Sequence, residues 1–313
     1  MGYMVSVKWG IATFAALGLA APALARPERA KRPSPQAAPR IRKITPATEA
    51  QIAAFRTQAM AWHQKAQKDI VPALHLVETR NFLVFSAWSR KNDARLRQVC
   101  ETMYTHLRRQ FALPRNQPVW AGKLPIFLFH EVRHFRRFTN EVDGRKAPGS
   151  GGYLSQRSDG FCYIVLNRAY SSTHFYGLLV HEGTHAFLAR YRTDAPLVPW
   201  VNEGLAETMA ARLVPGCEAA TRYTQATAEA VRGNRDVSGI FRGVRLSEFD
   251  YGIAQSLVRF LIARDRKRFI NFVKLLKVGA SDEEALRHAY GLTRKELLAE
   301  WRRASKKALG RKR

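Results

Sequence analysis

Two histidines stand four positions apart in the stretch FYGLLVHEGTHAFLARY (residues 175–191), where apolar residues recur at helical spacing. Residues at i and i+4 lie on the same side of a helix, one turn apart. His181 and His185 would therefore present two imidazole nitrogens together, as a divalent zinc ion requires. Glu182 completes the pattern H-E-x-x-H, in which the glutamate faces a metal-bound water. The pattern predicts metal-assisted hydrolysis.

The five-letter pattern occurs twice in the chain, so the residues that follow each copy decide between them. After His185, the stretch PWVNEGLAETMAARL (residues 199–213) is typical of a second amphipathic helix, and Glu203 lies eighteen residues beyond that histidine. A helix at this separation can pack against the first and supply a carboxylate as third ligand, which leaves a fourth position for water. We therefore expect His181, His185 and Glu203 to bind zinc.

The other copy runs from His130 to His134 and lacks a comparable third ligand. Glu141 is too close in sequence to fold back easily, and the next acid is Asp159. Three arginines between positions 133 and 137 would also place positive charge around a cation. We expect this copy not to be a metal site.

Taken together, HEGTH and NEGLAE resemble the gluzincin metallopeptidases, the thermolysin-like clan in which HExxH is followed by a glutamate ligand on a later helix. The chain is most similar to secreted bacterial peptidase-like domains of that clan, in which WxNEGLAE follows shortly after HEGTHAF. The resemblance covers about residues 78–305. It implies zinc ligands at His181, His185 and Glu203, and a general base at Glu182.

Two further residues are implied by the same resemblance. An acid four residues past the ligand glutamate holds the first histidine in relatives, and here that acid is Glu207. The stretch FDYGIAQSLVRFL is similar to the helix whose tyrosine donates to the oxyanion, so Tyr251 is the candidate donor. The alternative for Tyr251 is a tyrosine that packs at a helix start with its hydroxyl in water.

The implied activity is that of a secreted zinc metallopeptidase. Zinc would activate a water and polarise the scissile carbonyl, while Glu182 would take the proton of the water and return it to the leaving amine. The expected partner is a peptide or protein substrate. Subsite pockets are not identifiable, so exopeptidase and endopeptidase action both stay open.

We expect an α+β fold of the zincin type, with a mixed α/β N-terminal lobe that carries an edge strand and the active-site helix, and an all-helical C-terminal lobe. NFLVFSA, LPIFLF and the two halves of GGYLSQRSDGFCYIVLNR read as strands, and an apolar stripe from Leu96 to Phe111 marks a helix. In the family the strand before the zinc helix forms the cleft edge, which here would be residues 161–166. Capping boxes at Ser281 and Thr293, separated by Gly291, predict two late helices.

The N-terminal segment predicts export. Lys8, an apolar run and Ala23-Leu24-Ala25 match a signal peptide over residues 1–25, with the mature chain beginning near Arg26. Residues 26–44 are rich in proline and arginine and read as a linker. We expect a periplasmic, envelope or extracellular protein without a further membrane-spanning segment.

A helix is expected over residues 45–70, with Thr45 as N-cap and Pro46 in the first turn. Its expected buried stripe comprises Ile52, Phe55, Ala59 and Trp62. The catalytic domain would then span residues 71–313, with lobes of about 71–199 and 200–313.

Three cysteines, Cys100, Cys162 and Cys217, allow one disulfide in an exported chain, but Cys100 and Cys162 lie on apolar faces that suit core thiols. Sequence does not select a pair.

The chain has 313 residues, with 46% hydrophobic content, 52 lysines and arginines against 25 acids, and a net charge of +27. This composition indicates a globular protein with a sizeable core. Seven basic residues lie between positions 26 and 43, and seven more between positions 302 and 313. These termini suit an anionic envelope surface, while the absence of a base-stacking motif within them argues against a specific nucleic acid. The alternative function is therefore a non-catalytic basic envelope protein, or a pseudo-peptidase that binds zinc and anionic polymers.

Overall fold

The computed structural model describes residues 4–5, 41–114, 117–149, 151–167, 172–243 and 245–310. The fold is α+β, as expected: every described strand precedes residue 172, and the described chain beyond it is helical. The expected signal peptide, residues 1–25, lies outside the described residues except for positions 4–5. The basic linker lies outside them except for positions 41–44.

One mixed sheet has the strand order β1-β5-β6-β4-β3-β2. β3, β4 and β6 are parallel, while β2, β5 and β1 pair antiparallel with their neighbours. The bounds are β1 Met4–Val5, β2 His75–Glu78, β3 Phe82–Ser86, β4 Leu124–Phe129, β5 Gly152–Gln156 and β6 Cys162–Asn167.

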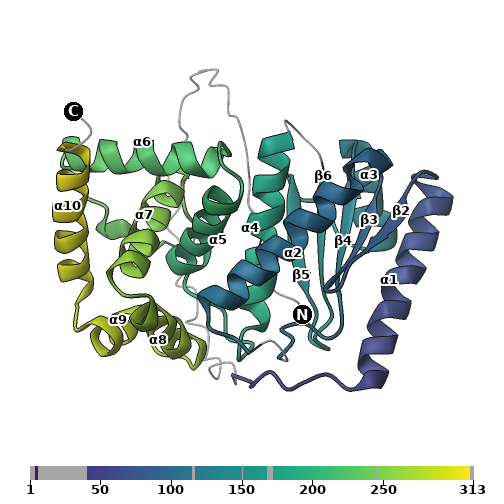
Figure 1. Ribbon diagram of the computed structural model, residues 1–313, viewed down its shortest axis with the longest axis horizontal. Helices are drawn as coiled ribbons and strands as arrows, with labels where there is room; N and C mark the ends of the chain where they lie inside the picture. Colours follow the sequence, from purple (N-terminus) through teal and green to yellow (C-terminus); the bar gives the residue numbers. More distant parts are fainter. Residues whose placement is uncertain are drawn as a thin grey trace, which may run out of the picture.

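The inner strands are buried on both faces, which explains their continuous apolar runs. In β3, Phe82 and Val84 pack into the cluster that contains the apolar residues of α2 and α4. Leu83 and Phe85 alternate with them and join the cluster beneath α1. Figure 1 shows this layering, with α1 on one side of the sheet and α2 and α4 on the other.

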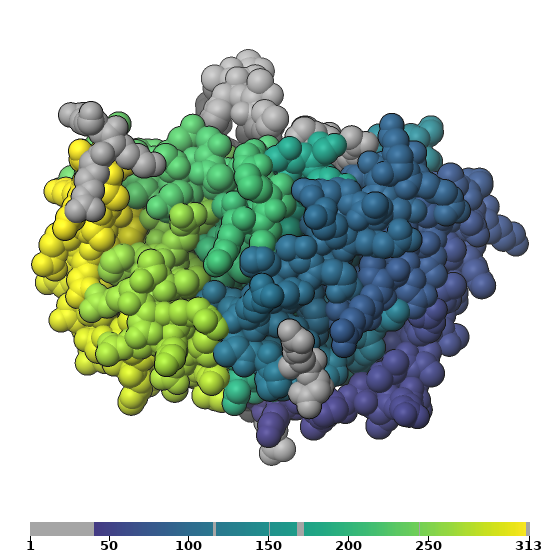
Figure 2. Space-filling model, in the orientation of Figure 1, coloured from purple at the N-terminus to yellow at the C-terminus, as the bar shows by residue number. Residues whose placement is uncertain are grey.

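The helices divide into those that cover the sheet and those that form the C-terminal half. α4 stands between the two groups, and Figure 2 shows the halves side by side, purple to teal beside green to yellow. The bounds are α1 Glu49–Asp69, η1 Arg90–Asn92, α2 Asp93–Gln110, α3 Val132–Arg137, η2 Phe138–Val142, α4 Ser172–Arg190, α5 Pro199–Leu213, α6 Glu218–Arg232, η3 Ser238–Phe241, α7 Glu248–Arg264, α8 Arg266–Lys277, α9 Asp282–Tyr290 and α10 Arg294–Gly310.

Two glycines allow the helices around α4 and α5 to approach closely. A Cβ added at Gly183 of α4 would lie 2.2 Å from the sulfur of Met103 in α2. One added at Gly204 of α5 would lie 2.4 Å from the carbonyl oxygen of Ala254 in α7. At Gly204 a side chain would meet the backbone of α7, so this glycine is a packing requirement. At Gly183 a side chain would displace the flexible end of Met103.

The helix α10 and its predecessor begin as expected. Ser281 and Thr293 each exchange hydrogen bonds with a glutamate three residues on, and Gly291 ends α9 with φ 70°.

Lys277, at the end of α8, reaches the other group of helices. Its ammonium donates to the carbonyls of Leu188 (2.9 Å), in the last turn of α4, and Ala195 (2.6 Å).

The start of α1 corrects the expectation of an N-cap at Thr45. The helix begins at Glu49, and Thr48 forms the capping box with Gln51. Residues 42–44 are instead held in an extended course against residues 192–194, through a bridge between Lys43 and Thr193. Backbone groups used in that pairing cannot serve a helix.

The expected stripe of α1 is only partly buried. Ala59 is fully buried, and Phe55 and Trp62 pack against the sheet, but Ile52 is 38% exposed.

The expected cleft edge is also corrected. Residues 161–166 largely coincide with β6, which lies between β4 and β5 and has no free edge. β5 is the next strand outward, and its other side pairs antiparallel with Met4–Val5. β2, the opposite edge of the sheet, was not predicted.

All three cysteines are free thiols in the buried interior, so Cys100 and Cys162 are core residues, as one alternative held. Among the described residues, no helix combines the length and apolarity that crossing a membrane requires.

Candidate metal centre

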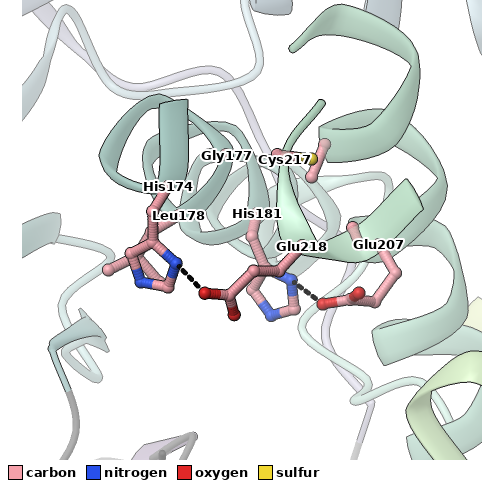
Figure 3. Close-up of a pocket in the computed structure, with 9 residues that line it drawn as sticks. His174, Gly177, Leu178, His181, Glu207, Cys217 and Glu218 are labelled. Atoms are coloured by element: carbon pink, nitrogen blue, oxygen red, sulfur yellow. Dashed lines mark ion pairs between the residues drawn. The ribbon is translucent and has the colours of Figure 1, made fainter. Parts of the chain in front are cut away.

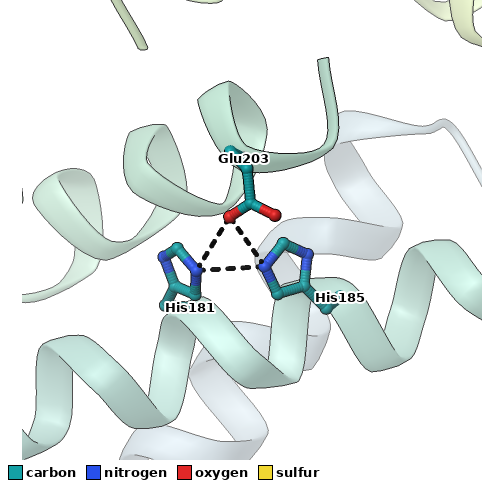
Figure 4. Close-up of side chains that lie close together, drawn as sticks. All are labelled: His181, His185 and Glu203. Carbon is teal, nitrogen blue, oxygen red and sulfur yellow. Dashed lines mark hydrogen bonds and ion pairs between the residues drawn. The ribbon is translucent and has the colours of Figure 1, made fainter. Parts of the chain in front are cut away.

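Three predicted ligands converge at the packed faces of α4 and α5. His181 and His185 project from adjacent turns of α4, and Glu203 projects toward them from the first half of α5 (Figure 4). The two Nε2 atoms are 3.0 Å apart, and Oε2 of Glu203 lies 3.3 Å from His181 Nε2 and 3.2 Å from His185 Nε2. All three side chains are buried. Within the described residues this is the group of histidine, cysteine and acidic side chains that could hold a metal ion.

The triangle has the dimensions of a metal-binding face. A tetrahedral ion whose ligand atoms lie about 2.0 to 2.1 Å away holds those atoms about 3.3 to 3.4 Å apart. The three observed separations of 3.0 to 3.3 Å are close to that edge length. The donor set, two imidazole nitrogens and one carboxylate oxygen, also suits an ion with an open fourth position. These residues therefore fit a divalent metal without rearrangement of the helices.

Glu207 fixes the orientation of the first histidine. Its Oε1 lies 3.0 Å from His181 Nδ1, and its Oε2 accepts a 2.7 Å hydrogen bond from Arg222 Nη1 in α6. Because Nδ1 donates its proton to Glu207, Nε2 of a neutral His181 keeps its lone pair for a ligand. Glu207 and Arg222 are 2% and 7% exposed, so this chain of contacts is shielded from water.

The buried carboxylates shift the pKa values around the site. Burial by itself would lower the pKa of His181, but the hydrogen bonds that His181 donates to Glu203 and Glu207, and the charges of these carboxylates, outweigh burial and raise that pKa. Burial would raise the pKa of Glu203, but the two histidines outweigh it and lower that pKa. In the absence of a metal, a proton is therefore stabilised between His181 and the carboxylates. A metal ion must displace this proton, so proton binding and metal binding compete at the site.

Glu182 lies at the same site but does not belong to the triangle. It is completely buried, and burial raises the pKa of its carboxyl, while the charges of His181 and His185 act to lower it. The backbone N–H of Leu154 in β5 approaches this carboxyl and favours its ionised form without completing a hydrogen bond. Glu182 is thus a buried carboxyl close to the triangle and close to β5.

Tyr251, in the first turns of α7, also reaches the centre. Its ring centroid lies 6.4 Å from that of His181. Burial and the nearby charges of Glu203, Glu207 and Glu182 raise the pKa of its hydroxyl. The tyrosine therefore keeps its proton close to these carboxylates, and its side chain is partly buried.

A cavity of about 20 Å³ lies on the Glu207 side of the centre, enough for about one water molecule. In Figure 3, His174 of α4 and Glu218 of α6 point toward one another across its mouth, with Nδ1 and Oε1 2.8 Å apart. His181 and Glu207 line the same cavity. The His174–Glu218 pair thus forms part of the wall of this cavity, and the Glu218 side chain is 54% exposed.

The two histidines of the other H-E-x-x-H copy are not neighbours on a helix. α3 begins at Val132, so His130 precedes the helix and only His134 lies within it. His130 is exposed, and His134 Nδ1 lies 3.9 Å from an oxygen of Glu131. The spacing of i and i+4 therefore does not place these two imidazoles one turn apart on a helix.

Sequence reasoning missed Arg222 and His174. Arg222 had one available signal: it shares a helical face with Ala219, Ala226 and Ala230, which are all buried, so its side chain had to enter the interior. A buried arginine requires an acidic partner, and Glu207 is that partner. His174 precedes the H-E-x-x-H pattern by two helical turns and carried no comparable signal.

Neither a protein-family model nor a curated protein matches this chain.

Proposed function

We propose that the protein is a zinc-dependent peptidase of the gluzincin type. The observation that carries the proposal is a metal-sized triangle of His181, His185 and Glu203 with a buried, non-ligating carboxyl, Glu182, beside it. A structural metal site closes all four positions with protein side chains, whereas three protein ligands leave one position for a reacting molecule. When bound, zinc supplies Lewis acidity, which polarises a carbonyl and lowers the pKa of water.

The residues of the chain divide the remaining work. Glu182 accepts a proton from water and later delivers it to the departing amine, and burial raises the pKa of its carboxyl, which makes it a stronger base. Tyr251 keeps its proton and donates a hydrogen bond to the developing oxyanion. Glu207 and Arg222 hold His181 in the tautomer and orientation that a ligand needs.

The sheet supplies a site for the substrate backbone. β5 packs beside α4, since a Cβ added at Gly151 would lie 3.3 Å from Leu178. The outer side of β5 pairs with an extended segment, Met4–Val5, in antiparallel register with Leu154 and Ser155, and removal of the expected signal peptide, residues 1–25, would free this edge. A peptide that added to this edge would be held mainly by backbone hydrogen bonds, next to Glu182. The motif Ala23-Leu24-Ala25 further supports a role on exported or envelope polypeptides.

The test combines metal content with hydrolysis of a peptide library. Wild type is expected to bind about one zinc per chain and to cleave peptides. Glu182→Gln should keep its zinc and its thermal stability but hydrolyse at least about 10² to 10⁴-fold more slowly, because it removes the general base alone. Equal rates in the variant and wild type would overturn the mechanism. A wild-type protein that holds zinc and cleaves nothing would favour the alternative, a pseudo-peptidase that binds zinc and anionic polymers.

A further inference from the structure

A second polar cavity lies away from the metal centre, at the far end of α4. Its volume is about 210 Å³. Its walls come from residues 42–47 of the N-terminal arm, the start of α1, the turn between β5 and β6, and Arg190, the last residue of α4. Arg190 is half-buried, and a Cβ added at Gly160 in the turn would lie 3.0 Å from its Nη1. Its guanidinium therefore lies against the turn at the cavity wall.

Arg190 differs from other arginines with similar burial. Arg190 has a buried Nε without a hydrogen-bond partner among the described residues, and so does Arg294. Arg222 and Arg294 each have carboxylates that compensate the charge, Glu207 and Asp282. No ion pair within the described residues joins Arg190 to a carboxylate. A partly buried guanidinium without a counterion is costly, so its surroundings call for an anion.

The acids of the cavity do not supply that anion. Asp194 is held by Arg42, through its backbone N–H at 2.7 Å and its Nε at 2.8 Å. Asp159 lies 3.2 Å from an Nη of Arg157. Each of these two acids therefore pairs with another arginine. Asp194 is near enough for its charge to raise the pKa of Arg190 against the larger, lowering effect of burial, but it forms no ion pair with that guanidinium.

The remaining lining residues supply suitable donors. Lys43 adds a second cation that has no carboxylate partner among the described residues, and Gln51, Gln156 and Ser158 add amide and hydroxyl groups. The four basic and two acidic lining residues give a net charge of +2 (4 − 2). Burial also lowers the pKa of the Arg190 guanidinium, as expected for a cation whose charge is poorly compensated.

We propose that this cavity binds a small oxyanion, a phosphate, sulfate or carboxylate group, between the guanidinium of Arg190 and the ammonium of Lys43. A guanidinium offers paired N–H groups that match two oxygens of such an anion. The volume of the cavity, about 210 Å³, suits a single small group. The bound anion would join the N-terminal arm, the β5–β6 turn and the end of α4, and would therefore stabilise the folded chain. This site does not rest on the proposed peptidase activity.

The test measures anion binding by calorimetry and thermal denaturation, with a chelator present so that phosphate does not act through a metal. Ionic strength is kept constant with chloride. Wild type is expected to bind one inorganic phosphate and to show a saturable rise in Tm. Arg190→Gln should weaken binding at least tenfold. Arg303→Gln, which removes the same charge from an exposed position on α10, should leave binding unchanged.

A second variant keeps the proposal testable if Arg190→Gln does not fold. Gln156→Glu places a carboxylate in the cavity, so it should raise the Tm in anion-free buffer and weaken phosphate binding. Two further comparisons distinguish the sources of the oxyanion. Binding of sulfate is compared with binding of phosphate, and binding of a blocked dipeptide with a free carboxyl is compared with binding of its amide. Equal phosphate responses in wild type, Arg190→Gln and Gln156→Glu would mean unspecific attraction to a basic protein, and the proposal would be wrong.

Discussion

Arg222→Met tests whether the chain of contacts from α6 to the metal centre holds its histidine in place. The substitution preserves length and apolar packing but removes the group that donates to Glu207 at 2.7 Å. Glu207 is 2% exposed and would keep only the hydrogen bond with His181. The other two acids near Arg222 are Glu218 and Glu248, whose side chains are 54% and 83% exposed, so water can replace the arginine there.

The expected loss of stability in Arg222→Met arises because the buried charge of Glu207 is left unpaired. Breaking a buried ion pair by removing one partner typically costs about 3 to 5 kcal/mol, which is a large share of a domain stability of about 5 to 15 kcal/mol. Loss of a group that orients a metal ligand typically weakens metal binding about 10 to 100-fold. Arg222→Met should show both effects, measured by urea denaturation with a chelator present and by zinc titration against a competing chelator.

A double substitution separates stability from positioning. Arg222→Met combined with Glu207→Leu removes both charges, so most of the lost stability should return. Zinc binding should stay weak, because His181 would still lack the acceptor for its Nδ1–H. The exposed Arg212→Met at the end of α5 serves as control and should change stability by about 0.5 kcal/mol or less. A single variant that loses less than about 1 kcal/mol and binds zinc normally would refute the reasoning.

Three further predictions address other parts of the molecule. Burial lowers the pKa of Lys277 from 10.5 to about 8, so unfolded chains bind more protons between these pH values and stability should rise with pH there. Relative to Lys277→Met, the rise in the free energy of unfolding should approach about 3 kcal/mol in pH-dependent denaturation, and a parallel pH course in both proteins would contradict it. Metal analysis should find that His130→Ala keeps its zinc, whereas His181→Ala loses most of it; retention in both would exclude the triangle as the binding site. Tyr251→Phe should lower turnover on the order of 10 to 10³-fold in peptide assays with little change in zinc content, and unchanged turnover would place the oxyanion donor elsewhere.

The parts of the fold that sequence predicted are those where one local pattern dominates. The apolar runs of β3, β4 and β6 and the stripe of α2 reflect burial within the sheet layer, so the sequence pattern identified them. β5, GYLSQ, was identified as the partner of β6 across the turn at Ser158-Asp159-Gly160. β2 carries the sequence HLVE at the edge of the sheet, too short and too polar to be distinguished from a loop. The start of α1 was misplaced because Thr45 and Thr48 offer similar caps, and a tertiary contact decides between them.

The order of strands was not predictable in the same way. β5 and β6 are both largely buried and adjacent in sequence. Only the pairing of β6 with β4 shows that β6 is the inner strand of the sheet. The same distinction between local pattern and tertiary packing applies to the candidate metal centre. His181 and His185 follow from spacing on one helix, and Glu203 from a motif, whereas Arg222 arrives from α6 through the packing of α5, α6 and α7.

The close helix contacts at Gly183 and Gly204 have a consequence for how the candidate centre would acquire a metal ion. With Met103 and Ala254 fitted against these glycines, the ligand side chains are ordered by the folding of the core itself. Metal binding then need not supply the energy of folding, as it must in small zinc domains. The apoprotein should therefore be stable and folded. Metal binding should depend on how an ion reaches the formed site rather than on refolding of the chain around the ion.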